Sequence, residues 1–213
     1  MSSLLIVDDH TVVREGLGRV LGSEFPGCVI GYAATAQEAL ATLDEGSWRL
    51  AILDISLPGG DGLELIRSVR DRSASTRILV HTMHPEDQFA VRSLRAGADG
   101  YITKDASVNE IIFAVRKILH GGRYVSSSLA EILAGAMAAH ADRGIASLSD
   151  REFQVLRSVT QGKTPTDIAD ELVLSIKTVS TYRARILEKL ELRTTADLIR
   201  FGLEHHLDGT PRT

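Results

Sequence analysis

An aspartate follows a short apolar segment in the first half of the chain. Residues 50–53 are Leu, Ala, Ile and Leu, and Asp54 comes directly after them. An uninterrupted apolar run of this length is typical of a parallel strand that is buried on both faces. Turn-forming residues follow at 55–62, which places Asp54 at the carboxyl end of the strand, where open α/β sheets bind ligands. We therefore expect Asp54 to accept a phosphoryl group.

Polar side chains also stand at the ends of three other predicted strands: Asp8 and Asp9 after the first, Thr82 in the fourth and Lys104 in the fifth. One acid in such a place commonly caps the next helix, but the carboxyl ends of parallel strands share one edge, so these groups should converge there. Clustered carboxylates repel one another, and a Mg²⁺ ion, which prefers oxygen ligands, removes that cost. A carboxylate beside the ion can attack phosphorus, while Thr82 and Lys104 hold the oxygens of the acyl phosphate.

The segments that must position these residues alternate between strand and helix patterns. Strands are predicted at residues 4–7, 28–32, 50–54, 77–82 and 100–104. Helices with apolar spacing of three and four are predicted at residues 11–23, after Thr35, from about 61, at 85–96 and at 107–120. Thr35 and Glu38 have the spacing of a capping box. The alternation predicts an α/β doubly wound, five-stranded parallel sheet.

The second half of the chain carries helix patterns only. Gly121 and Gly122 end the last helix of the sheet, and one more helix is predicted at about 128–140, before a tether at 141–147. Four helices should follow, starting near residues 149, 165, 176 and 195. Two short helices, a tight turn and a longer basic helix predict a small all-α helix-turn-helix domain. We therefore expect a domain at 1–120, a linker at 121–147 and a second domain at 148–213.

Charge is concentrated on the third helix of that second domain. The net charge of the chain is −4, which by itself argues against nucleic-acid binding, but residues 176–193 hold five basic and two acidic side chains. The helix face opposite the apolar stripe can dock on DNA, and Arg183 at its edge can reach a phosphate. The residues expected to contact DNA are Lys177, Ser180, Thr181, Arg183, Ala184 and Arg185.

The bulk composition fits an intracellular protein. Cys28 is the single cysteine, so no disulfide can form within the chain. No apolar run approaches the roughly 20 residues that span a bilayer, and the N-terminus enters a strand without a leader. We expect a cytoplasmic protein that does not associate with membranes.

The strand-end residues of the first half resemble the receiver domain of two-component response regulators, a flavodoxin-like fold, over about residues 3–120. The resemblance implies that Asp54 is phosphorylated and that Asp9, Asp54 and the backbone carbonyl of Ser56 bind Mg²⁺, with Asp8 acting largely through a metal-bound water. It also implies that Lys104 holds the phosphoryl oxygens. Thr82 and Tyr101 would form a switch pair, with the hydroxyl moving toward the phosphoryl group and the ring turning inward.

One departure from the family pattern concerns the residues after Thr82. The family often has a small residue there, whereas this chain has Met83 and His84. Bulk at this point restricts the water that attacks the phosphoaspartate. We expect slow autodephosphorylation, and no enzymatic activity beyond it and the receiver's own phosphoryl transfer.

The second half, over about residues 148–207, resembles the LuxR-type helix-turn-helix. The matching residues include Leu148 to Glu152, Val155-Leu156, Gly162, Ile168-Ala169, Lys177-Thr178-Val179, Tyr182 and Lys189-Leu190. Together the two halves resemble a NarL/FixJ-type response regulator, and residues 180–183 are similar to a BvgA-like subset. The resemblance implies a sensor histidine kinase as phosphoryl donor, and a homodimer, formed on phosphorylation, that binds paired half-sites in double-stranded promoter DNA. RNA polymerase is a further candidate partner.

Three other classes of function can be compared with this interpretation. An aspartate-nucleophile phosphatase needs a second acid two residues after the nucleophile, and Ser56 occupies that position. A flavin-binding domain needs a hydroxyl-rich phosphate loop after the first strand, where Asp8-Asp9-His10 would repel a phosphate. A receiver whose second half is an adaptor for protein partners stays open, and DNA footprinting would separate it from a DNA-binding regulator.

Overall fold

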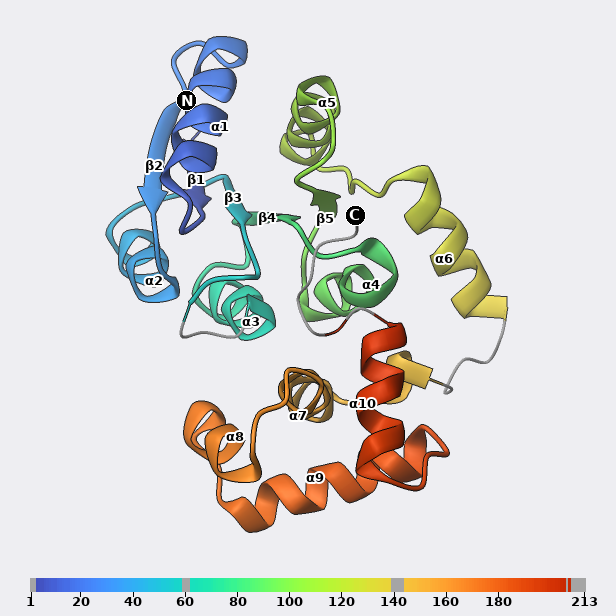
Figure 1. Ribbon diagram of the computed structural model, residues 1–213. Helices are drawn as coiled ribbons and strands as arrows, with labels where there is room; N and C mark the ends of the chain where they lie inside the picture. Colours follow the sequence, from blue (N-terminus) through green and yellow to red (C-terminus); the bar gives the residue numbers. More distant parts are fainter. Residues whose placement is uncertain (1–2, 59–61, 139–143, 206, 208–213) are drawn as a thin grey trace. The chain divides into compact units, whose positions relative to one another are not determined.

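The structure, a computed structural model, describes residues 3–58, 62–138, 144–205 and 207 (Figure 1). The chain divides into two compact units, residues 1–135 and 136–213, which are described separately below. The first unit combines strands and helices, and the second consists of helices. The sequence-derived boundaries at 120 and 147 differ from this division and stay a prediction.

A five-stranded sheet forms the centre of the first unit. Its strands are β1 Ser3–Val7, β2 Val29–Ala33, β3 Leu50–Leu53, β4 Arg77–Thr82 and β5 Gly100–Thr103. They lie in the order β2-β1-β3-β4-β5, and every neighbouring pair is parallel. This is the predicted doubly wound arrangement, with the switch in strand order beside β1.

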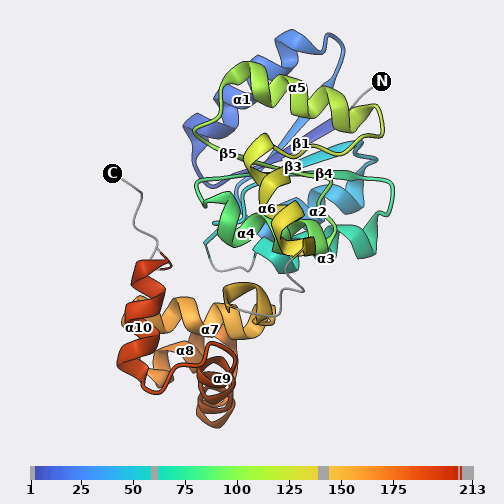
Figure 2. The same cartoon turned by 90° about the vertical axis from the view of Figure 1, so that its right-hand side faces the viewer.

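Helices cover both faces of the sheet. They are α1 Thr11–Glu24, α2 Ala36–Glu45, α3 Gly62–Arg72, α4 Glu86–Ala96 and α5 Val108–Leu119. Helices α1 and α5 lie on one face and α2, α3 and α4 on the other (Figure 2). The four strands other than the edge strand β2 are therefore mostly buried, and all four residues of β3 are buried.

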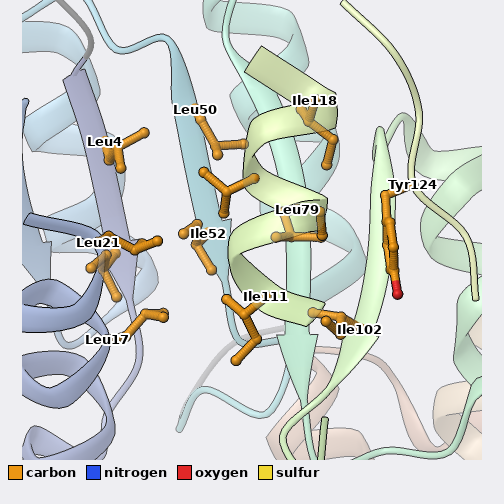
Figure 3. Close-up of a cluster of buried hydrophobic side chains, with 13 residues drawn as sticks. Leu4, Leu17, Leu21, Leu50, Ile52, Leu79, Ile102, Ile111, Ile118 and Tyr124 are labelled. Atoms are coloured by element: carbon orange, nitrogen blue, oxygen red, sulfur yellow. The ribbon is translucent and has the colours of Figure 1, made fainter. Parts of the chain in front are cut away.

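The core under α1 and α5 shows how the sheet edge is held. Leu4, Ile52 and Ile102 extend from their strands toward Leu21 of α1 and Ile111 of α5 (Figure 3). Alternation along each strand then gives the polar residues at the strand ends a fixed side of the sheet. Burial of these branched side chains contributes roughly 1.5–3 kcal/mol each to the stability of the sheet.

The predicted capping box at the start of α2 forms only in part. The Thr35 side chain accepts a hydrogen bond from the Glu38 backbone N–H at 3.1 Å, as expected. The Glu38 carboxylate, however, accepts from the backbone N–H of Ala34 at 2.8 Å. The reciprocal bond is thus shifted by one residue, and the N–H groups before the helix are still satisfied.

Helix α6 Ser127–Ala138 begins as part of the first unit. The Ser126 hydroxyl donates to the Glu86 carboxylate at 2.7 Å, and Ser128 donates to the same carboxylate. The helix was predicted at about 128–140, and its last two predicted residues lie outside the described residues. A short 3-10 helix, η1 Gly144–Ser147, precedes the second unit.

The second unit contains four helices: α7 Asp150–Thr160, α8 Pro165–Leu172, α9 Ile176–Lys189 and α10 Thr195–Glu204. Capping boxes begin α7, α8 and α10, and the Ser175 side chain caps α9. The core is formed by fully buried apolar residues from all four helices, among them Leu156, Ile168, Val179, Ile186 and Leu198. Val173 makes the turn between α8 and α9 in a left-handed conformation with φ of 54°.

Candidate functional site

Lys104 joins two of the predicted acids at the carboxyl edge of the sheet. Its Nζ lies 2.6 Å from Oδ2 of Asp54 and 2.6 Å from Oδ2 of Asp8. The three side chains are between 1% and 8% exposed, so this ion network is shielded from water. The sheet extends up to these residues, since Asp54 donates its N–H to Val7 and Lys104 donates its N–H to Thr82, both at 2.8 Å.

The partners of Asp54 keep its carboxylate ionised. Burial by itself raises the pKa of Asp54, but the hydrogen bond from Lys104 and that from the backbone N–H of Ser56, at 2.8 Å, lower it below its ordinary value. The Thr82 hydroxyl adds to the same effect. Burial also lowers the pKa of Lys104, and its two carboxylate partners outweigh this and raise it. A nucleophilic carboxylate and a protonated amine therefore coexist at neutral pH.

Asp9 and His10 complete an acidic cluster with Asp8 and Asp54. One ligand atom from each of the four residues lies within 4.8 Å of the others. The Oδ1 atom of Asp9 is shielded from solvent and lacks a hydrogen-bond partner among the described residues, although the His10 ring nitrogen is 2.9 Å away. An oxygen-rich donor set with an unsatisfied carboxylate fits a hard divalent cation such as Mg²⁺. The sequence did not single out His10, because one histidine after two acids carries no specific signal.

Thr82 and Tyr101 are linked through the β4–α4 loop. The Thr82 hydroxyl lies 3.3 Å from that of Ser56, and the backbone N–H of His84 donates to it at 3.4 Å. Tyr101 is fully buried, and its hydroxyl donates to the backbone carbonyl of His84 at 2.8 Å. The Tyr101 ring is therefore turned inward in this structure, and its role as a switch residue stays a prediction. His84 itself stacks on Phe89, with the ring centroids 4.2 Å apart, which fixes the loop.

His81 is a buried titratable residue that sequence reasoning missed. It is 6% exposed, and its Nε2 lacks a hydrogen-bond partner among the described residues. Burial and the nearby charge of Lys104 lower the pKa of His81 to about 4, against the opposing influence of Asp8 and Asp54. The imidazole is therefore neutral at physiological pH. In the sequence, a histidine in a predicted strand beside an apolar run looks like an ordinary core residue. Only the fold shows that His81 lies near the charges of Lys104, Asp8 and Asp54.

The predicted DNA-contacting residues form most of the exposed surface of α9. Lys177, Ser180, Thr181, Ala184 and Arg185 are all exposed, whereas Val179 and Ile186 on the opposite side are buried. The two sides of the helix thus differ as the periodicity predicts.

Arg183 differs from the other five. It is only partly exposed, one of its Nη atoms donates to the Thr195 hydroxyl at the start of α10, and its Nε is buried without a partner among the described residues. The guanidinium group was expected to reach a phosphate from the core edge. It is instead held in part by the second unit itself, so its phosphate contact stays a prediction.

Comparison with known proteins agrees with this arrangement. Residues 4–116 match the family model of the response regulator receiver domain, and residues 146–201 match that of bacterial regulatory proteins of the luxR family. The chain belongs to the response regulator family. This response regulator is 32% identical over 209 residues to the response regulator UvrY of Escherichia coli, with 97% of the chain and 96% of the relative covered. It is 35% identical over 206 residues to the response regulator GacA of Pseudomonas protegens, covering 96% and 97%.

Among solved structures, RcsB matches nearly the whole chain, and a shorter structure matches about two thirds of it. RcsB of Salmonella enterica, bound to the rprA promoter in the presence of a phosphomimetic, superposes with a TM-score of 0.73 at 25% identity, covering 94% of this chain and 97% of that chain. A LuxR-family response regulator from Aurantimonas, 35% identical, gives a TM-score of 0.60 over 65% of this chain and 99% of that chain. The response regulator therefore joins a receiver to a LuxR-type DNA-binding domain and is a phosphorylation-dependent transcription regulator.

The described helices are also informative about membranes. None of those within residues 3–58, 62–138 and 144–205 combines the length and the apolar composition needed to cross a bilayer. The expected cytoplasmic location stays a prediction.

Proposed function

We propose that this response regulator takes a phosphoryl group from a sensor histidine kinase onto Asp54. A carboxylate oxygen of Asp54 attacks the phosphorus of the kinase phosphohistidine, the P–N bond breaks, and an O–P bond of an acyl phosphate forms. The observation that carries this proposal is the position of Lys104, 2.6 Å from both Asp54 and Asp8. Its ammonium can follow the negative charge from the carboxylates to the phosphoryl oxygens without leaving the buried site.

Mg²⁺ is the proposed cofactor of this step. The residues that would hold it are Asp9, Asp54 and the backbone carbonyl of Ser56, with Asp8 acting through water. Bound there, the ion supplies positive charge that offsets the clustered carboxylates and the phosphoryl oxygens. The unsatisfied oxygen of Asp9 and the close approach of the acids support this assignment.

Thr82 and Tyr101 are proposed to report the phosphorylation. The Thr82 hydroxyl, at the end of the neighbouring strand, lowers the pKa of Asp54 and so lies close to its carboxylate. The same hydroxyl can bond to a phosphoryl oxygen on Asp54 instead. A shift of Thr82 changes its contacts with the backbone of His84, the residue whose carbonyl holds the Tyr101 hydroxyl. The chemical change at Asp54 thereby reaches the β4–α4 loop and helix α4.

The output is proposed to be DNA binding through α9. Lys177, Ser180, Thr181, Arg183, Ala184 and Arg185 would face the major groove and the adjacent phosphates. Two copies of the chain, brought together by phosphorylation, would bind paired half-sites about 34–36 Å apart per helical turn. The RcsB structures bound to promoter DNA support this assignment, and RNA polymerase remains a candidate partner.

The test combines one phosphorylation-site variant with a matched control. Purified Asp54→Asn protein should form no acyl phosphate with a histidine kinase or a small phosphoryl donor, whereas Asp105→Asn, an exposed acid in the loop after Lys104, should label like the parent protein. Labelling is followed by intact mass and by its lability at alkaline pH. A labelled Asp54→Asn protein would refute the assignment of Asp54. Footprinting with and without the donor then tests whether phosphorylation strengthens DNA binding.

A further inference from the structure

Two hydroxyl groups on the exposed side of α9 bond to the helix itself. The Ser180 hydroxyl donates to the backbone carbonyl of Ile176 at 3.0 Å, and the Thr181 hydroxyl donates to that of Lys177 at 3.0 Å. A hydroxyl has a single hydrogen to donate. Neither group therefore offers a free donor to a ligand, although the side chains are exposed.

At the centre of the exposed side of α9, the groups that a ligand can contact are apolar. The hydroxyl of Thr181 occupies one position on its Cβ atom, and the other heavy-atom position carries the methyl group. Ala184 follows three residues later, so its methyl group lies on the same side of the helix. Both residues are exposed. Two neighbouring methyl groups thus lie in the middle of the exposed side of α9, with Lys177 one turn before them.

The major groove contains one apolar base substituent that suits such a surface. Thymine presents a 5-methyl group there, and Ala or the Thr methyl makes apolar contact with it, whereas the other bases present hydrogen-bonding groups. On the premise that α9 contacts DNA as proposed above, we propose that Thr181 and Ala184 determine specificity by packing their methyl groups against thymine methyl groups. Lys177 and Arg185, also exposed on α9, would supply the phosphate contacts that set the register.

The competing explanation is hydrogen-bonded readout. The Thr181 hydroxyl can still accept a hydrogen bond, so it could read the amino group of adenine or cytosine. The two explanations predict opposite behaviour when the methyl and the hydroxyl of Thr181 are removed separately. They can therefore be distinguished with two variants at one exposed position.

The experiment uses the full chain with beryllofluoride as phosphoryl mimic. Selection from random duplexes defines the preferred site, and each thymine of that site is then replaced in turn by deoxyuridine, which lacks only the methyl group. Loss of one buried methyl should weaken binding about fourfold at one or two positions of each half-site and leave the other positions unchanged.

Variants assign the effect to the two side chains. In Thr181→Ser the hydroxyl stays and the methyl is lost, so deoxyuridine should no longer weaken binding at the position that Thr181 reads. In Thr181→Val the methyl stays and the hydroxyl is lost, so the fourfold loss should persist. Ala184→Gly should remove the effect at a neighbouring position, and its helix content is checked by circular dichroism.

Each result decides between the two proposals. If every deoxyuridine is tolerated, methyl readout is wrong. If losses occur but persist in both Thr181→Ser and Ala184→Gly, they reflect DNA shape, and methyl readout by these two residues is wrong. If Thr181→Val changes the base preferred at its position in the selected site while Thr181→Ser does not, the hydroxyl is the reader and methyl readout by Thr181 is wrong. If selection enriches no sequence at all, DNA binding by α9 fails, and the inference fails with it.

Discussion

The first unit buries the charges it uses, and the second exposes them. Asp8, Asp54 and Lys104 lie at the sheet edge with at most 8% of their side chains exposed, each within hydrogen-bond distance of another. Lys177 and Arg185 of α9, in contrast, are exposed. Phosphoryl transfer needs charges that are fixed before the reaction and shielded from water, whereas a phosphate backbone is bound by charges that reach into solvent.

Each unit also has one lysine that bridges to a buried acid, and the two lysines differ in purpose. Lys104 stands between two acids in the proposed phosphoryl-transfer site, where Mg²⁺ would compete with it for the carboxylates. Lys189 bonds to Glu152 at 2.7 Å and to the backbone carbonyl of Ser147 at 3.2 Å, which ties the end of α9 to the start of α7. The same ion-pair chemistry thus serves reactivity in one unit and helix placement in the other.

Loss of Lys104 is expected to have the largest effect. Lys104→Met leaves Asp8 and Asp54 buried without their cation, which should lower the free energy of unfolding of the first unit by about 3–5 kcal/mol at pH 7. Urea denaturation measures this, with the exposed Lys117→Met as control. Mg²⁺ should restore more stability to Lys104→Met than to the parent protein. Equal stabilities of the two variants would show that the network contributes nothing.

Acidification should destabilise the first unit through His81. Its pKa is about 4 in the folded protein and near 6.5 when unfolded, so the unfolded state binds more protons between these values. Stability is therefore fully present above pH 6.5 and falls as the pH drops toward 4, by about 3 kcal/mol in total. Denaturation midpoints across this range should fall more steeply in the parent protein than in His81→Leu. A parallel pH dependence of the two proteins would contradict this assignment.

The corresponding variant in the second unit should be milder. Lys189→Met removes one partner of Glu152. Burial by itself raises the pKa of Glu152, but the bonds with Lys189 and Ser149 lower that pKa below its ordinary value. Lys189 is 40% exposed, so we expect a loss of about 1 kcal/mol in the unfolding of this unit. Thermal denaturation with Lys177→Met as control measures it. Phosphorylation of Asp54 should be unchanged. A changed labelling rate would contradict the view that the Lys189–Glu152 pair only positions helices in the second unit.

The smallest effect is expected at Met83. It follows Thr82 directly and is 64% exposed, so its side chain is not part of the core. Met83→Ala should speed hydrolysis of the phosphoaspartate severalfold by admitting water, with little change in stability. The decay of labelled protein after removal of the donor measures this. An unchanged or slower decay would refute the expectation of slow autodephosphorylation.

The elements were largely predictable because local signals agree with the tertiary fold. Strand β4 begins and ends at the predicted residues, and β2 is shifted by one residue. Helix α7 begins near the predicted residue 149, where Ser149 and Glu152 form a capping box because three-residue spacing fixes their geometry within one turn. The shifted bond of Glu38 to Ala34 shows the limit, since flanking backbone competes for the same carboxylate.

The sequence by itself determined which residues stand at the strand ends and which side of α9 is polar. The strand ends follow from where the apolar runs stop, and the polar side of α9 follows from the helix period of 3.6 residues. Only the tertiary structure decided that Lys104 bridges two acids, that His81 lies buried near that charge, and that Arg183 bonds to Thr195. These contacts join residues far apart along the chain. Their side-chain positions depend on how the neighbouring elements pack, which no local pattern encodes.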